Sequence, residues 1–232
     1  MNSKIYSNKD LIGTAELQVS DASMGVLRGT FKPTERYFEV VQEEVWNFWN
    51  SEKVDYKKWE SLRFNAQLEN GLFLSPQGGF TIEDSPEFPD EPKNIDIAGV
   101  HHQIITDFLE TEPPRPFVEE PWSQLRIEQK LAFENELEKE LSSKKSPILF
   151  FKKHEPEHLL HGVNFSATCH DQRSDDVLFE INGTNIEECF ALVHLTWKGK
   201  PEVQGYPNTK LYQDFDHFKH DRMYPDKTDW ED

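Results

Sequence analysis

The chain has 232 residues, of which 36% are hydrophobic and 12% aromatic, so it can bury a core of useful size. Its 43 acidic and 25 basic residues give a formal net charge of -18, which argues against direct binding to nucleic acid or to an anionic membrane, since both need a basic surface. A mean hydropathy of -0.75 and the absence of an apolar run near ~18 residues exclude a transmembrane helix.

The N-terminus and the cysteines predict the compartment. Met1 is not followed by an apolar segment of ~7–15 residues, so no secretory signal is expected. Cys169 and Cys189 are the only cysteines, and they do not form a C-x-x-C motif. We interpret both as reduced thiols in the cytoplasm, and a single bridge between neighbouring strands is the alternative.

The first half of the chain mixes strands with one helix. Two loosely alternating segments, 11–19 and 24–31, flank a polar turn and are expected to be strands. Thr34 is a candidate N-cap for a helix from 35 to about 50, whose apolar residues recur at helical spacing. The dipeptide Asn70-Gly71 predicts a hairpin turn. Further strands are expected at 61–68, 71–75, 80–83 and 95–105.

One acidic loop in this half is a candidate partner-binding segment. It places five carboxylates around Phe88, and its prolines limit its flexibility: Glu83, Asp84, Glu87, Asp90 and Glu91. An aromatic anchor ringed by negative charge is a plausible contact for a basic protein. A solvated loop is the alternative. The acidic pair Asp175-Asp176 completes the set of candidate partner-binding residues.

A proline-rich segment divides the chain. Half of the 14 prolines lie between Pro86 and Pro121, and the run 110–121 can form neither a helix nor a central strand. We therefore predict an N-terminal α+β domain at 1–109, a linker at 110–121 and a C-terminal α+β domain at 122–232. Both halves are acidic, with net charges of -11 up to residue 121 and -7 beyond it.

The second half opens with a long amphipathic pattern that predicts a helix over about 122–141. Strands are expected at 148–152, 162–169, 177–181 and 189–197, and His194 is interpreted as a buried, hydrogen-bonded residue of the last strand. A final helix is expected over about 209–223. The whole chain is predicted to be α+β, with antiparallel sheets and helices packed on them.

The sharpest catalytic pattern is His154-Glu155-Pro156-Glu157-His158, which fits the H-E-x-x-H letters of zinc proteases. That chemistry needs both histidines on one helical face, and Pro156 lies between them, so a polar turn is favoured over a metal site that could include His161. The nucleophile-elbow, P-loop and dinucleotide motifs are absent. No catalytic residue, metal or cofactor is therefore assigned.

Two resemblances suggest a role. The segments 175–180, 190–202 and 206–212, which include the run Val193-His-Leu-Thr-Trp197, resemble small uncharacterised bacterial proteins with this ending, over about residues 125–232. The whole chain resembles immunity proteins of bacterial polymorphic toxin systems, and this implies a small, acidic, cytosolic α+β protein that blocks a toxin domain, often a basic nuclease. The expected function is a non-enzymatic acidic inhibitor. The alternatives are a metal-dependent hydrolase using His154, Glu155 and His158, or a structural interaction module.

Overall fold

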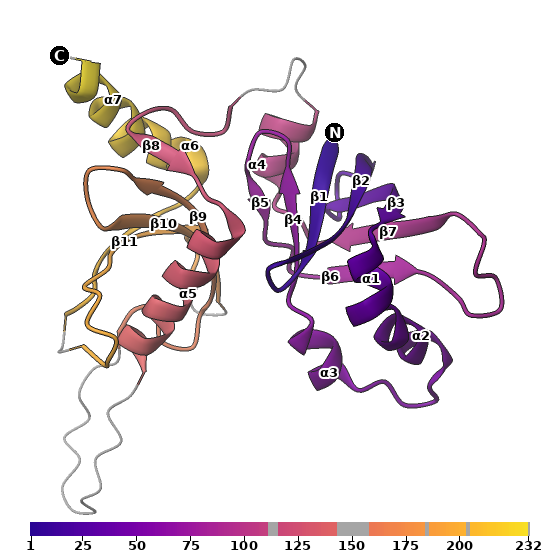
Figure 1. The fold of residues 1–232 in the computed structure, drawn as a ribbon. Coiled ribbons are helices and arrows are strands. Elements are labelled where there is room, and N and C mark those ends of the chain that lie inside the picture. Colours follow the sequence, from indigo (N-terminus) through magenta and orange to yellow (C-terminus); the bar gives the residue numbers. More distant parts are fainter. Residues whose placement is uncertain (111–115, 143–157, 184–185, 203–204, 232) are drawn as a thin grey trace, which may run out of the picture. The chain divides into compact units, whose positions relative to one another are not determined.

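The computed structural model describes residues 1–110, 116–142, 158–183, 186–202 and 205–231. The chain divides into two compact units, unit 1 from Met1 to Phe117 and unit 2 from Val118 to Asp232 (Figure 1). The boundary falls inside the proline-rich segment 110–121. Each unit combines helices with an antiparallel sheet, which confirms the predicted α+β class.

Unit 1 is built on a curled sheet of seven strands in the order β5-β4-β1-β2-β3-β7-β6, in which every neighbouring pair is antiparallel. The two strands expected around the turn at 20–23 form a long hairpin. The first strand was not predicted from the sequence. The strands are β1 (Asn2–Ser7), β2 (Asp10–Asp21), β3 (Val26–Pro33), β4 (Phe64–Leu68), β5 (Phe73–Leu74), β6 (Gly79–Glu83) and β7 (Lys93–Ala98).

One face of this sheet forms the core of unit 1, because successive side chains of a strand point to opposite faces. In β7 the buried positions are Lys93, Ile95 and Ile97, and the residues between them are partly exposed. In β6 the buried positions are Phe80 and Ile82. The same alternation continues one step beyond β6 and directs Asp84 inward, beside Lys93.

Short helices complete unit 1: α1 (Glu35–Val40), α2 (Gln42–Asn50), α3 (Tyr56–Ser61) and α4 (His102–Ile104), which runs into the π-helical turn η1 (Ile105–Leu109). The single helix expected over 35–50 is wrong, because the helix breaks at Val41, where φ is -125°. Thr34 does not cap it, since its hydroxyl donates to the Leu11 carbonyl. The strand expected over 95–105 ends at Ala98.

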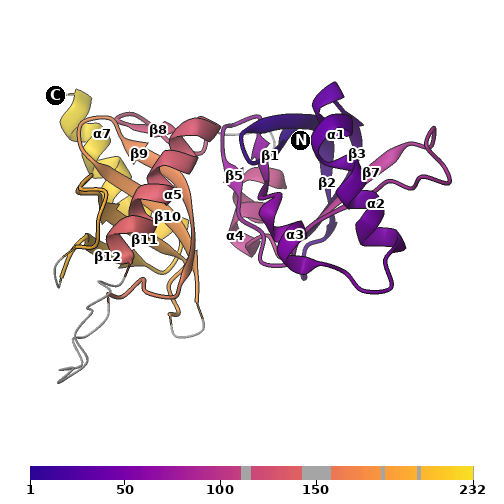
Figure 2. The same cartoon turned by 60° about the horizontal axis from the view of Figure 1, so that its bottom comes forward.

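Unit 2 has a five-stranded antiparallel sheet in the order β12-β11-β10-β9-β8. Helix α5 (Ile127–Leu141) packs on one face, where Phe133 contacts the ring of His170. The C-terminal helices pack on the other face, where Phe215 contacts Phe190 (Figure 2). The strands are β8 (Trp122–Gln124), β9 (Asn164–Asp171), β10 (Asp176–Asn182), β11 (Phe190–His194) and β12 (Asn208–Tyr212), and the C-terminal helices are α6 (Phe215–Phe218), η2 (Lys219–Met223) and α7 (Tyr224–Glu231).

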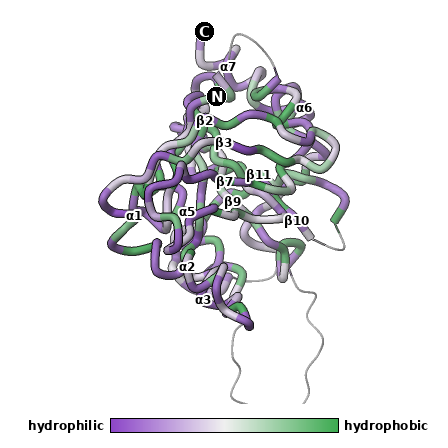
Figure 3. The backbone as a smooth tube through the Cα atoms, turned by 90° about the vertical axis from the view of Figure 1, so that its right-hand side faces the viewer, coloured by the Kyte–Doolittle hydropathy of each residue, from purple (hydrophilic) through white to green (hydrophobic). Residues whose placement is uncertain are grey.

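Two helix predictions in unit 2 are corrected. The helix expected from residue 122 begins only at Ile127, because 122–124 pair with β9 as a strand. The helix expected over 209–223 begins only at Phe215, because 208–212 pair with β11. The strand expected at 148–152 lies outside the described residues. In Figure 3 hydrophobic residues recur along the strands, whereas α5 is largely hydrophilic.

Two further predictions concern the state of the cysteines and the presence of a membrane-spanning helix. Cys169 and Cys189 are both free thiols. Cys169 is fully buried, and burial raises the pKa of its thiol. Within the described ranges, no helix combines the length and the apolar character needed to cross a membrane.

Candidate partner-binding site

The hairpin loop between β6 and β7 carries the predicted acidic segment. It folds back on itself, since the Phe88 amide donates to the Ser85 carbonyl (3.2 Å) and the Glu91 amide donates to the Phe88 carbonyl (3.2 Å). Lys93 Nζ donates to the Pro89 carbonyl (3.1 Å), which ties the loop to the start of β7. These hydrogen bonds give the loop a defined conformation within the β6–β7 hairpin.

A pocket of about 440 Å³ lies beneath this loop, within the size range of ligand sites. Two of its lining residues are exposed aromatic side chains, Phe88 at 56% and Trp49 at 48%. Trp49 comes from α2, and its indole N–H donates to the Ile82 carbonyl (2.7 Å), which fixes the ring beside β6. The lining residues are Trp49, Glu83, Asp84, Ser85, Phe88, Glu91, Pro92, Lys93 and Asn94.

The base of the pocket corrects one prediction, because Asp84 is only 5% exposed and is not a surface contact. Its Oδ2 accepts hydrogen bonds from the Tyr37 hydroxyl (2.8 Å) and Gln42 Nε2 (3.0 Å), and its Oδ1 lies 3.1 Å from Lys93 Nζ. Burial acts to raise the pKa of Asp84, but the hydrogen bonds from Gln42, Tyr37 and Lys93 together hold it below its ordinary value. The base is thus a charged, internally paired carboxylate.

The other predicted acids of the loop lie at its surface. Glu83 is already paired within the chain, since its Oε2 accepts hydrogen bonds from the Arg28 guanidinium (2.7 Å) and from the Asn94 amide (3.0 Å). Glu87, Asp90 and Glu91 are exposed and form no ion pair within the described part of the chain. The negative charge of these three carboxylates is therefore not neutralised by an ion pair with any described residue.

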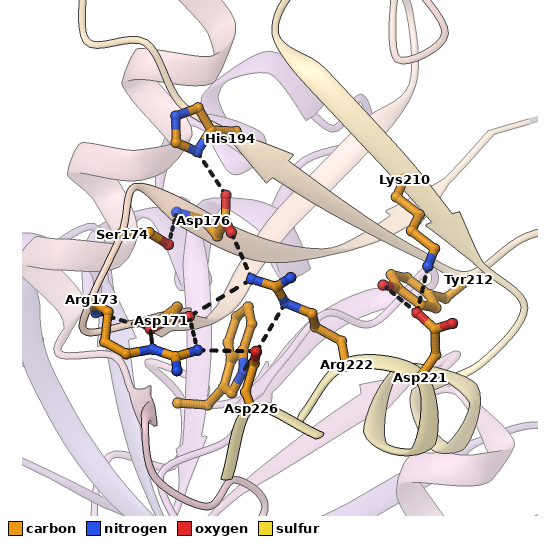
Figure 4. A network of polar contacts seen from close by, with 11 residues as sticks. Asp171, Arg173, Ser174, Asp176, His194, Lys210, Tyr212, Asp221, Arg222 and Asp226 are labelled. Carbon is orange, nitrogen blue, oxygen red and sulfur yellow. Dashed lines mark hydrogen bonds and ion pairs between the residues drawn. The ribbon is translucent and has the colours of Figure 1, made fainter. Parts of the chain in front are cut away.

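The predicted pair Asp175-Asp176 belongs to unit 2. Asp175 is exposed, whereas the carboxylate of Asp176 is already paired with other residues of the chain. Asp175 is exposed and accepts from the Trp197 indole N–H (2.9 Å). Asp176 accepts from Arg222 Nη2 (3.1 Å) and from His194 Nδ1 (2.7 Å), so it is not a free partner contact (Figure 4). The prediction for His194 is also corrected, because its side chain is 51% exposed rather than buried.

Asp176 belongs to a network that joins the C-terminal helices to the sheet (Figure 4). Arg222 lies 2.9 Å from Asp226 and 3.1 Å from Asp176, and Arg173 binds Asp171 with two nitrogens, at 3.1 and 2.8 Å. Burial raises the pKa of Asp171, but hydrogen bonds and charge from Arg173, with the charge of Arg222, bring it below its ordinary value. Because each carboxylate already has a guanidinium partner, we interpret this network as an anchor for η2 and α7.

The H-E-x-x-H pattern is only partly within the described residues, since His154 and Glu155 lie outside them. Both ring nitrogens of His158 form hydrogen bonds within the chain. Nε2 donates to the Pro207 carbonyl (3.0 Å), and Nδ1 accepts from the Leu160 amide (3.1 Å). Burial lowers the pKa of His158. The described residues hold no group of three or more His, Cys, Asp and Glu side chains placed to bind a metal ion.

Sequence reasoning located the loop but missed the other walls of the pocket, Trp49, Lys93 and Asn94. A signal for Lys93 was present, because Lys93, Ile95 and Ile97 alternate with polar residues and the first must point to the same face as the isoleucines. No comparable local signal exists for Trp49, which lies 34 residues before Glu83.

The comparisons with known proteins add no relative. No family model matches the chain, and neither a curated protein nor a solved structure matches it. The functional argument therefore depends on the geometry and the charge of the loop and its pocket.

Proposed function

We propose that the chain is a non-enzymatic acidic binding protein of the cytoplasm, which inhibits a basic toxin domain by covering it, as immunity proteins do. One observation carries the proposal: the exposed, unpaired carboxylates Glu87, Asp90 and Glu91 adjoin a pocket with two exposed aromatic walls. Aromatic residues such as tryptophan are enriched in interface hot spots, and complementary charge speeds the encounter with a partner and sets its specificity.

The charge of the whole chain supports the same proposal. A net charge of -18 attracts a cationic partner from a distance and raises the rate of encounter. The loop carboxylates then act at short range, where the partner docks. Because exposed charges are screened by salt, the association rate is expected to fall steeply as ionic strength rises.

The test begins with affinity capture of the tagged full-length chain from the cells that produce it, at low salt, with elution in rising salt. The captured basic protein is then used to measure association rates against ionic strength. The loop variant carries Glu87→Gln, Asp90→Asn and Glu91→Gln, which remove charge but keep shape. We expect it to associate at least roughly tenfold more slowly at low salt.

A matched variant separates the loop from the general charge. Glu16→Gln, Glu35→Gln and Glu60→Gln remove the same charge from exposed positions of unit 1 outside the loop. It should retain most of the association rate. If both variants slow association equally, or if no basic protein is retained at low salt, the proposal fails.

A further inference from the structure

We propose that the pocket beneath the acidic loop receives an arginine side chain of the partner, with its guanidinium between Trp49 and Phe88. This inference rests on the proposed function, since it names the group that the basic partner contributes.

The walls favour a flat cation. Trp49 and Phe88 line the pocket from α2 and from the loop, and both keep about half of their surface exposed. A planar guanidinium stacks on aromatic faces and is weakly hydrated, so it loses little when it leaves water for such a wall. A lysine ammonium is compact and strongly hydrated, and it gains less between two rings.

The base of the pocket disfavours a second ammonium. Lys93 Nζ, with a side chain only 8% exposed, already lies 3.1 Å from Asp84 Oδ1. An entering lysine would bring its point charge toward this ammonium and compete for the same carboxylate. A guanidinium spreads its charge over a plane and can remain between the rings, above the pair formed by Asp84 and Lys93.

The acceptors of the pocket match a donor with several N–H groups. Glu91 lines the pocket and has no ion pair in the described chain, and Glu83 lies on the same lining. Five guanidinium N–H donors in a fixed fork can address acceptors on different sides, whereas an ammonium concentrates its donors at one atom.

The test compares two blocked peptides of equal length and charge, acetyl-Gly-Arg-Gly-Arg-Gly-amide and its lysine counterpart, with the citrulline peptide as the uncharged analogue of the first. Each is titrated into the full-length chain, and binding is followed by the NMR signal of the Trp49 indole N–H, assigned with Trp49→Phe. We expect the arginine peptide to bind roughly fivefold more tightly than the lysine peptide, and the citrulline peptide to bind more weakly than either.

Variants connect this preference to the pocket. Phe88→Leu should remove the arginine preference while lysine-peptide affinity changes little, and Phe88→Tyr should retain the preference. Phe38→Leu is the matched control, because Phe38 is 51% exposed but does not line the pocket. It should leave both affinities unchanged.

The outcomes separate this inference from the proposed function. Equal affinities for the arginine and lysine peptides would overturn the guanidinium site, while charge-driven association of the loop would still stand. A Trp49 signal that no peptide shifts would overturn it too, and the loop-variant kinetics with the captured partner would then decide the proposed function separately.

Discussion

At the scale of single residues, a strand that is covered on both faces buries its charged side chains together with its apolar ones, as in β10, where residues 177–181 are all buried. Glu180 of β10 is an example, because it is 7% exposed and its Oε2 has no hydrogen-bond partner among the described residues. Burial raises the pKa of Glu180 to about 8, and the charge of Lys130 only partly opposes this. The folded chain therefore holds a proton on Glu180 at neutral pH.

Glu180→Gln tests this buried proton. The unfolded pKa of a glutamate is about 4.3, so folding takes up a proton between that value and the folded pKa of about 8. The stability that this proton provides is complete below the unfolded pKa and is lost as pH rises through the folded pKa. The variant cannot ionise, so we expect its urea midpoint to rise relative to the natural chain as the pH goes from about 5 to about 9.

Exposed Glu138 provides the comparison for this experiment. Glu138→Gln should give a pH dependence parallel to that of the natural chain. A Glu180→Gln curve that is also parallel would show that Glu180 does not hold the proton.

At the scale of elements, two carboxylates of α5 support the loop that follows β11. Glu140 Oε1 accepts from the Thr196 amide (2.7 Å), the Thr196 hydroxyl (2.9 Å) and the Trp197 amide (3.0 Å). Glu136 accepts from the Gly199 amide (2.7 Å). Trp197 has a φ of 55°, which is left-handed and strained for this residue. The carboxylates of Glu136 and Glu140 thus support the strained conformation of the loop after β11.

Glu140→Ala should release this loop. The change removes a charged acceptor of three part-buried hydrogen bonds, so we expect a loss of about 2–4 kcal/mol in the free energy of unfolding. Urea denaturation measures the loss, and amide hydrogen exchange at Thr196 and Trp197 should become faster. The matched variant Glu138→Ala changes an exposed residue of the same helix and should stay within about 0.5 kcal/mol of the natural chain. Equal stability of the two variants would contradict the supporting role.

At the scale of the whole molecule, each unit has its own apolar core. The fully buried side chains Ile5, Leu17 and Phe73 belong to unit 1, and Phe179 and Phe218 belong to unit 2. Each unit also carries an excess of acidic residues, so self-repulsion within each unit opposes its compact state. Core formation and charge repulsion are therefore properties of each unit taken by itself.

The fragments 1–117 and 118–232 should consequently fold when they are produced separately. We expect each to show a cooperative thermal transition by circular dichroism and dispersed amide signals by NMR. Moderate salt should raise both transition temperatures, because it screens the acidic surface. A fragment without a cooperative transition would show that its core needs the other half of the chain.

The parts of the fold and the site that the sequence predicted depend on local patterns. Alternation and turn residues indicated the hairpin of β2 and β3, and composition alone located the acidic loop around Phe88. The α+β class followed from the succession of such patterns. These signals are local because the side chains that define them are neighbours along one strand or one turn.

Only the tertiary structure decided which residues meet. Residues 208–212 read as the start of a helix, yet they form β12 because β11 offers them an antiparallel partner. Asp84 reads as one more acid of the loop, yet Lys93 and Tyr37 hold it in the base of the pocket. Trp49 faces the loop because α2 packs beside β6, and its indole N–H reaches the Ile82 carbonyl. Such contacts join residues that lie far apart in the chain, and their free energy exceeds the local preferences that a sequence displays.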